Sequence, residues 1–228
     1  MRLRAPFAAA AVLIAVTGCG GGAGAVKPAG PPPAATIIAQ LKTAIREARS
    51  VHMTGEVRNG GSTVSLDMSL TRVGGMSGSI GSAGTKLDII GVGHLAYIKV
   101  TGAFLKLAHA PATECPNACG KYVATSASAA AAIIGDLSMS KLLGDVSDSL
   151  PRYVDSGPAS ISGRQVLVLH GSDGSTLDVA AAGRPYPLRA IAPKSSNAGE
   201  LDFTEWNAVP TIAAPAAGQV ISLGQLAG

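Results

Sequence analysis

The sequence predicts an α+β fold in which an antiparallel β-sheet is covered on one side by helices. Apolar residues at helical spacing follow an early Gly/Pro-rich stretch. Short segments then alternate apolar and polar residues between Gly-containing turns, and an Ala-rich helical stretch interrupts them. Sequential strands joined by short turns pair antiparallel, and a sheet with one apolar face must cover that face.

The first helix is predicted over residues 35–50, where the apolar residues share one face at the 3.6-residue period. The clearest strand is 62–71, because Val64, Leu66, Met68 and Leu70 alternate there with polar residues. Asn59-Gly60 separates it from the strand-like segment 51–58 and is a strong hairpin signal. Further strands are expected at 76–80, 85–92, 94–100 and 103–107.

The second half begins with helical patterns at 126–134 and 137–143, followed by a Pro/Gly-containing loop at 151–158. Strands then resume, with Gly163 marking a bulge inside the first. They are expected at 160–170, 175–181, 186–192 and 199–207. On a regular last strand, Phe203 and Trp206 would face opposite sides unless a bulge re-aims one.

The N-terminus has the features of a lipoprotein signal peptide, residues 1–18. Arg2 and Arg4 precede an apolar run, which is too short to span a membrane. Val16-Thr17-Gly18-Cys19 resembles the bacterial lipobox, although Thr17 stands where Ala or Ser is commoner. We therefore expect lipid on Cys19, a flexible Gly/Pro tether over 19–34 and one domain over 35–228. The alternative is an ordinary cleaved signal followed by an accidental cysteine.

Composition narrows the function further. The net charge of +4 includes Arg2 and Arg4, which leave with the signal. The remaining basic residues are scattered, so no nucleic-acid partner is expected. The chain has no second long apolar stretch. We expect an exported monomer, held on the outer face of the bacterial cytoplasmic membrane by the Cys19 lipid.

No enzyme signature appears in the sequence, which has neither Gly-x-Ser-x-Gly nor His-Glu-x-x-His. His170-Gly171-Ser172-Asp173 contains the residue types of a hydrolase triad. However, neighbours in a turn do not give triad geometry, and turn chemistry explains them better. We therefore predict no catalytic residue, no cofactor and no metal site.

Cys115 and Cys119 are interpreted as a disulfide, because thiols outside the cell tend to oxidise and Pro116 and Asn117 form turns. A redox-active pair or half of a metal site are weaker alternatives. The spacing is not Cys-x-x-Cys, and no second pair of ligands stands nearby in the sequence.

The C-terminal third carries a family resemblance. Tyr186-Pro187 leads into one strand, Trp206-Asn207 ends a later strand, and a Pro-containing tail follows. Together with the lipobox and the tether, this resembles the LppX/LprA/LprF/LprG lipoproteins of actinobacteria, which are similar to LolA and LolB in fold. The resemblance covers most of residues 35–222, but the Cys115–Cys119 loop is not part of its pattern.

The resemblance implies a strongly curved sheet, or half-barrel, with an apolar cavity under its helices that holds an acylated lipid or glycolipid. The inward residues of the predicted strands are then the candidate lining. They are Val64, Leu66, Met68, Leu70, Leu87, Ile89, Leu95 and Tyr97. The residues themselves leave a second reading open, an envelope interaction protein with a filled core and no ligand. An exported hydrolase is a remote third.

Overall fold

The computed structural model describes residues 32–59, 61–134, 137–161, 163–193 and 198–222. Contacts divide the chain into residues 1–30 and one compact unit, Pro31–Gly228. The predicted signal peptide, Cys19 and nearly all of the tether lie outside the described residues. They therefore stay predictions.

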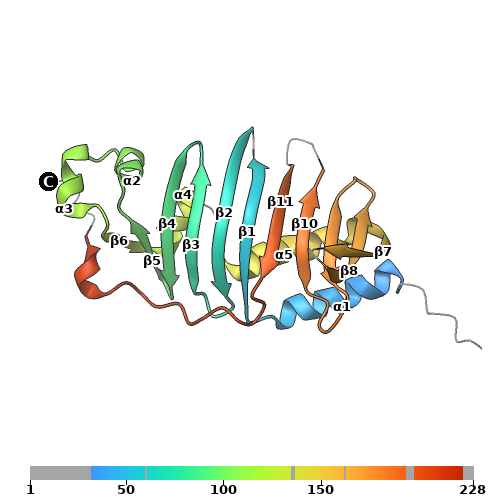
Figure 1. The fold of residues 1–228 in the computed structure, drawn as a ribbon. Helices are drawn as coiled ribbons and strands as arrows, with labels where there is room; N and C mark the ends of the chain where they lie inside the picture. Colours follow the sequence, from blue (N-terminus) through green and yellow to red (C-terminus); the bar gives the residue numbers. More distant parts are fainter. Residues whose placement is uncertain (1–31, 60, 135–136, 162, 194–197, 223–228) are drawn as a thin grey trace, which may run out of the picture. The chain divides into compact units, whose positions relative to one another are not determined.

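Twelve strands of the described chain form one unclosed, curved sheet with β12 and β7 at its edges (Figure 1). Neighbouring strands pair antiparallel, except that β12 runs parallel to β6. The strands are β1 (Ser50–Asn59), β2 (Ser62–Thr71), β3 (Met76–Ser82), β4 (Thr85–Val92), β5 (Leu95–Lys99), β6 (Tyr122–Ser126), β7 (Tyr153–Ile161), β8 (Arg164–Gly171), β9 (Thr176–Ala180), β10 (Pro187–Ala192), β11 (Gly199–Thr204) and β12 (Val220–Ile221). This arrangement confirms the predicted fold class.

The sheet is assembled from two meanders that meet in its middle. β1 to β6 follow one another in order, and β7 to β11 do the same. The two are joined where β1 pairs with β11, with Met53 opposite Phe203. On its other side Met53 lies opposite Met68 of β2. Because opposite residues of an antiparallel pair share a face, these three side chains lie on the same side of the sheet.

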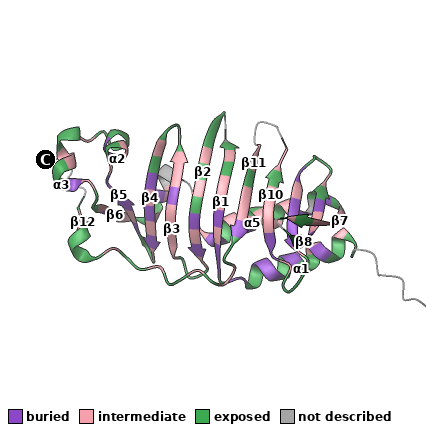
Figure 2. Ribbon diagram, in the orientation of Figure 1, coloured by how far each residue is buried: buried purple, intermediate pink, exposed green. Residues whose placement is uncertain are grey.

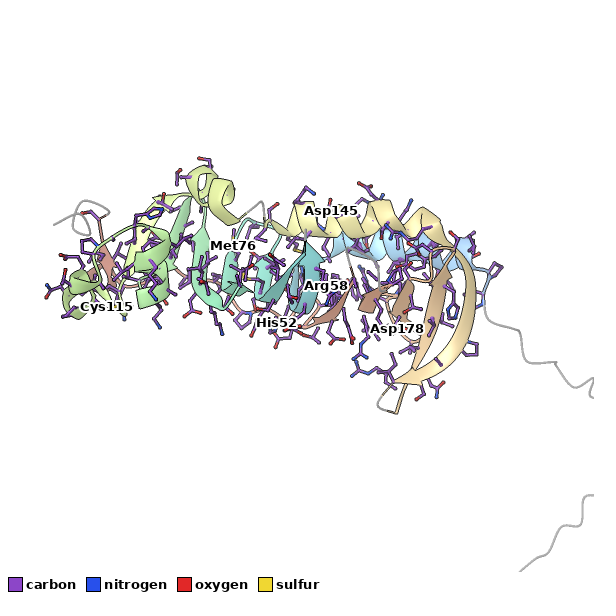
Figure 3. The ribbon with its side chains drawn as sticks, turned by 90° about the horizontal axis from the view of Figure 1, so that it is seen from above. His52, Arg58, Met76, Cys115, Asp145 and Asp178 are labelled. Carbon is purple, nitrogen blue, oxygen red and sulfur yellow. A yellow bond between two sulfur atoms is a disulfide. The ribbon has the colours of Figure 1, made fainter. Side chains whose placement is uncertain are left out.

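We call this side the inner face, because α1 (Ala34–Glu47) and α5 (Met139–Ser149) pack against it. Figure 3 shows both helices on one side of the sheet, side by side. The amphipathic face of α1 buries Ile37, Leu41, Ala44 and Ile45. The other helical segments are α2 (Gly102–Leu107), α3 (Cys115–Ala118), α4 (Ala127–Ile134) and three short 3₁₀ turns, Ala112–Glu114, Leu150–Arg152 and Ala217–Gln219.

Buried side chains form two separate clusters. The first lies under α1 and α5 and includes Leu41, Leu143 and Phe203. The second lies beside α2 and α3, where Phe104 and Ala118 pack against β4, β5 and β6. The inner face is thus covered by different helices at its two ends.

Three sequence predictions of local structure were wrong. Residues 103–107 were expected as a strand but belong to α2, because Thr101 caps the helix by accepting a hydrogen bond from the Phe104 amide at 3.1 Å. The expected loop 151–158 is mostly strand β7. Gly163 is not a bulge: it lies in the turn between β7 and β8 with φ +78°, where glycine is favoured.

Phe203 and Trp206 do not face opposite sides. Strand β11 ends at Thr204, and Glu205 then adopts φ +50°. This left-handed residue turns the chain, so Trp206 packs against the same cluster as Phe203, with ring centroids 6.2 Å apart.

The two short motifs of the C-terminal third contact each other. The Trp206 ring stacks on Tyr186 at 4.6 Å, and its Nε1 donates to the Pro187 carbonyl at 2.9 Å. Asn207 Nδ2 donates to the Tyr186 hydroxyl at 2.7 Å, while Asn207 Oδ1 accepts from the Arg49 amide at 2.6 Å. The pair Trp206-Asn207 therefore fastens the end of β11 to β10 and to the start of β1.

Candidate functional site

The inner face is open beside α2. Two adjoining hollows lie there, of about 420 and 140 Å³. Leu87 of β4 and Leu107 of α2 line both, so the two hollows adjoin at these side chains. We call them together the ligand groove. The complete lining is Val64, Ile80, Ser82, Ala83, Thr85, Leu87, Ile98, Phe104, Leu107, Ala108, Val123 and Thr125.

The strand register explains why these side chains meet. Leu66, Ile80 and Leu87 are successive partners across β2, β3 and β4, so they share the inner face. Ile98 and Val123 continue that face onto β5 and β6. Because α2 follows β5 directly, it returns over the end of the sheet where β3 and β4 are joined. The small residues Ser82 and Thr85 lie opposite each other at this end and leave space.

Burial changes along a single strand and marks where the helices stop covering the sheet. Met68 and Leu70 are fully buried under α1 and α5, whereas Val64 and Leu66 on the same face are half-buried. Figure 2 shows the same trend, with exposed colours toward the β1–β2 and β3–β4 hairpins. The groove is thus the uncovered continuation of a packed core.

The groove is apolar, with hydroxyls at its rim. None of its described lining residues carries a titratable side chain. A charged group placed there would lose hydration without gaining an ion-pair partner, which is costly. Alkyl chains have no such cost. Leu107 is 48% exposed and lies over both hollows, so it stands at the opening.

Only part of the candidate lining lies at this groove. Val64 and Leu87 line it, Leu66 is half-buried on the same face, and Ile89 is buried in the cluster beside α2. Met68 and Leu70 are buried in the packed cluster under α1 and α5. Whether any of them contacts a ligand stays a prediction.

The expected inward direction of Leu95 and Tyr97 was wrong. Leu95 is 45% exposed, and both residues lie opposite Val92 and Ile90, on the outer face. Ala96 and Ile98 are the inward residues of β5. The sequence held a signal for this, since Lys99 shares the two-residue period of Leu95 and Tyr97 and belongs in solvent.

Sequence reasoning missed the residues that α2 contributes. Phe104 and Leu107 lie in the segment expected as a strand, and Val123 lies in β6, which was not predicted. The helical signal that could have found α2 was Thr101 followed by the apolar stretch 103–107.

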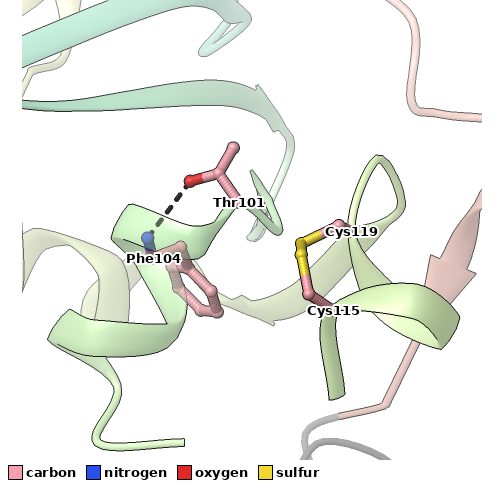
Figure 4. The surroundings of a disulfide bond; sticks show 4 residues. All are labelled: Thr101, Phe104, Cys115 and Cys119. Carbon is pink, nitrogen blue, oxygen red and sulfur yellow. Dashed lines mark hydrogen bonds between the residues drawn. A yellow bond between two sulfur atoms is a disulfide. The ribbon is translucent and has the colours of Figure 1, made fainter. Parts of the chain in front are cut away.

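Cys115 and Cys119 are joined by a disulfide, as predicted (Figure 4). They are one helical turn apart, and the Cys119 amide donates to the Cys115 carbonyl at 2.8 Å. The disulfide therefore closes the single turn of α3, and its two cysteines pack against the cluster that includes Phe104 of α2.

Other chemistry finds little support in the described part of the chain. No group of three or more metal-ligating side chains occurs there. His52 Nε2 lies 2.9 Å from Asp67 Oδ1 on the outer face, but no hydroxyl is hydrogen bonded to this pair among the described residues. In the same residues, no helix is long and apolar enough to span a membrane.

Solved structures match this fold at low sequence identity. LprF from Mycobacterium bovis is 18% identical, covers 83% of this chain and 100% of its own, and gives a TM-score of 0.57. Lipoprotein LppX from Mycobacterium tuberculosis is 14% identical, with 79% and 98% covered and a TM-score of 0.50. A LolA superfamily protein from Nitrosomonas europaea also matches, at 11% identity, with 76% and 92% covered and a TM-score of 0.27.

No protein-family model matches the chain, and neither does any curated protein sequence. The likeness to LprF and LppX is a likeness of fold. It confirms the resemblance to the LppX/LprF-type lipoproteins that the C-terminal motifs indicated.

Proposed function

We propose that this protein is a lipid-anchored envelope protein that binds or carries an acyl-lipid-like ligand in the ligand groove. The observation that carries the proposal is the apolar hollow of about 420 Å³ between α2 and the inner face. Its size falls within the roughly 300–1,000 Å³ of small-molecule sites, and its lining is apolar with a few hydroxyls. The resemblance to LppX/LprF-type lipoproteins supports the same ligand class.

The energetics suit an alkyl chain. Each methylene group removed from water contributes about 0.8 kcal/mol. About ten buried methylenes therefore supply about 8 kcal/mol, from which the entropy cost of immobilising the ligand is subtracted. The groove offers no charged partner, so we expect the polar head of such a ligand to stay at the rim, near Ser82 and Thr85.

The alternative is a lipid-anchored interaction protein without a ligand. The packing under α1 and α5 favours it, because that half of the inner face is filled by fully buried side chains such as Leu41, Met68 and Phe203. In this reading the space beside α2 is a surface depression, and the protein acts through a partner.

Native mass spectrometry separates the two readings. The unit of residues 31–228 would be purified from a lipid-containing host and weighed before and after solvent extraction. Binding predicts extra mass of acyl-lipid size that extraction removes and added lipid restores. A bare polypeptide mass that added lipid does not change would favour the interaction protein.

A matched pair of variants tests the place of binding. Leu107→Glu puts a charge at the groove opening, and Val73→Glu makes the same change in the turn between β2 and β3, where Val73 is 92% exposed. We expect Leu107→Glu to lose most of the bound lipid and Val73→Glu to retain it. Equal retention in both would place the ligand elsewhere.

The anchor is tested separately. Cys19→Ser in the full chain removes the sulfur that would carry lipid, so the protein should move from the membrane fraction to the soluble fraction. Two or more acyl chains give stable anchoring where one does not. Unchanged membrane attachment in this variant after a high-salt wash would contradict the lipobox prediction.

A further inference from the structure

Another hollow lies between α1 and α5, next to the packed cluster under these helices. Its volume is about 320 Å³. The cationic side chains of Lys42, Arg46 and Arg72 line it, and none of its described lining residues carries a carboxylate. We call it the basic groove. Figure 3 shows the two helices that form it side by side.

Lys42 and Arg46 stand one turn apart on α1, so their charges repel each other. Both residues are exposed, and among the described residues neither side chain has an ion pair or hydrogen bond. Like charges at this spacing destabilise a helix. Other cations nearby are neutralised, as Lys141 is by Asp145 and Arg184 by Glu47. The unpaired charges of the groove are thus available to an anion.

Arg72 is held in place at the groove. Its Nε donates to the Ala48 carbonyl at 2.6 Å, and its Nη2 donates to the Ile45 carbonyl at 2.9 Å. These bonds use two of the five N–H donors of the guanidinium. A guanidinium that is already oriented loses less conformational entropy when its remaining donors bind an oxyanion.

The floor of the groove is apolar. Ile45, Met139 and Leu143 lie beneath the cations. Cations around an apolar floor match the boundary of a phospholipid layer, where phosphate lies above the first methylenes of the chains. A fully hydrated polyanion such as nucleic acid would gain nothing from that floor.

The position in the chain agrees with this occupant. The helix α1 begins at Ala34, fifteen residues after Cys19. A Gly-rich coil of that length has an end-to-end distance of about 20 Å and reaches about 50 Å when extended. If Cys19 carries lipid, the basic groove is kept within reach of the membrane surface. The carboxylates Asp67, Asp88 and Asp202 lie on the opposite face of the sheet.

We propose that the basic groove docks the helix side of the protein onto an anionic phospholipid surface by binding lipid phosphate through Lys42, Arg46 and Arg72. Docking does not depend on a ligand in the ligand groove. It gives the anchored domain a preferred orientation on the membrane, with the outer face of the sheet turned away.

Vesicle flotation of the unlipidated unit of residues 31–228 tests the proposal. Vesicles of phosphatidylcholine alone are compared with vesicles that also contain phosphatidylglycerol, at low and high salt. We expect binding only to the anionic vesicles and loss of binding at high salt. Each cation near such a surface contributes about 1 kcal/mol, so Lys42→Gln with Arg46→Gln should weaken partitioning about 30-fold.

The matched control is Lys86→Gln with Lys99→Gln, which removes the same charge from β4 and β5, away from both helices. It should partition as the unmodified protein does. Equal weakening by both double variants would reduce the effect to net charge and overturn the proposal. Calorimetry with inorganic phosphate gives a second test. Binding of phosphate without any binding to vesicles would also overturn the proposal, because the site would then serve a soluble anion.

Discussion

Replacing Gly78 by alanine is predicted to disrupt the centre of the sheet. Gly78 lies in β3 opposite Met68 of β2, with φ +152°. A Cβ atom there would lie 2.0 Å from the Asp67 carbonyl oxygen and 2.8 Å from the Met68 Cα. Both contacts are with backbone, so no side-chain rotation relieves them. The strands β2 and β3 must separate locally.

Two costs set the size of the effect. Alanine in this backbone region costs about 1–3 kcal/mol. Separating the strands weakens about two ladder hydrogen bonds, each with a net contribution of about 1 kcal/mol. The sum is about 3–5 kcal/mol, a large fraction of the about 5–15 kcal/mol that stabilises a typical domain. Ile80 follows on the same strand and lines the ligand groove, so lipid binding should weaken too.

Urea unfolding, followed by the fluorescence of the single tryptophan, measures the loss. Gly157→Ala in β7 is the control, because no atom lies within 4 Å of its added Cβ. It should leave stability unchanged or raise it by about 0.4–1 kcal/mol. If the two variants unfold within 1 kcal/mol of each other, the close approach of β2 to Gly78 is not the constraint we describe.

Two more predictions concern the disulfide and a buried carboxyl. Replacing Cys115 and Cys119 by serine should lower the free energy of unfolding by about 2 kcal/mol on the loop-entropy model. It should also speed hydrogen exchange in α2 and α3. Unchanged exchange in α2 would show that the disulfide does not support the groove wall. Burial raises the pKa of the Asp178 carboxyl above its ordinary value of 3.8, although the nearby Arg189 guanidinium opposes this. The folded state therefore binds that proton more tightly than the unfolded state, and the charged form destabilises the fold above the raised pKa. Asp178→Asn should raise the free energy of unfolding at neutral pH, with a gain that shrinks as the pH falls and vanishes below 3.8; a gain that does not change with pH would contradict it.

Much of the fold could be predicted because its signals are local. The alternation in β2 and the Asn59-Gly60 pair placed the first hairpin, and the helical spacing from Ile37 to Ile45 placed α1 within a few residues. The secondary structure of short apolar stretches was harder to predict. The segment 103–107 is compatible with a strand or a helix, and the cap from Thr101 decides between them.

The candidate site could be predicted only in part, because its geometry depends on contacts between distant segments. Alternation places Val64 and Leu70 on one face but does not show that α5 covers only Leu70. The groove exists because α2 returns over Leu87 while α1 and α5 stop short of it. For Leu95 and Tyr97 the sequence did contain a local signal, because Lys99 lies on the same face of the strand and belongs in solvent. Both residues were nevertheless assigned to the inner face, whereas they lie on the outer face.

The position of β11 has a consequence for the order of folding. This strand is last in its meander, yet it lies at the centre of the sheet and is the link between β1 and β10. The two meanders can form hairpins before the chain is complete, but they join only after residue 204 has been added. Contacts between the beginning and the end of a chain form slowly, because they close a long loop. Trp206 stacks on Tyr186 in this same step, so its fluorescence should report the last event of folding.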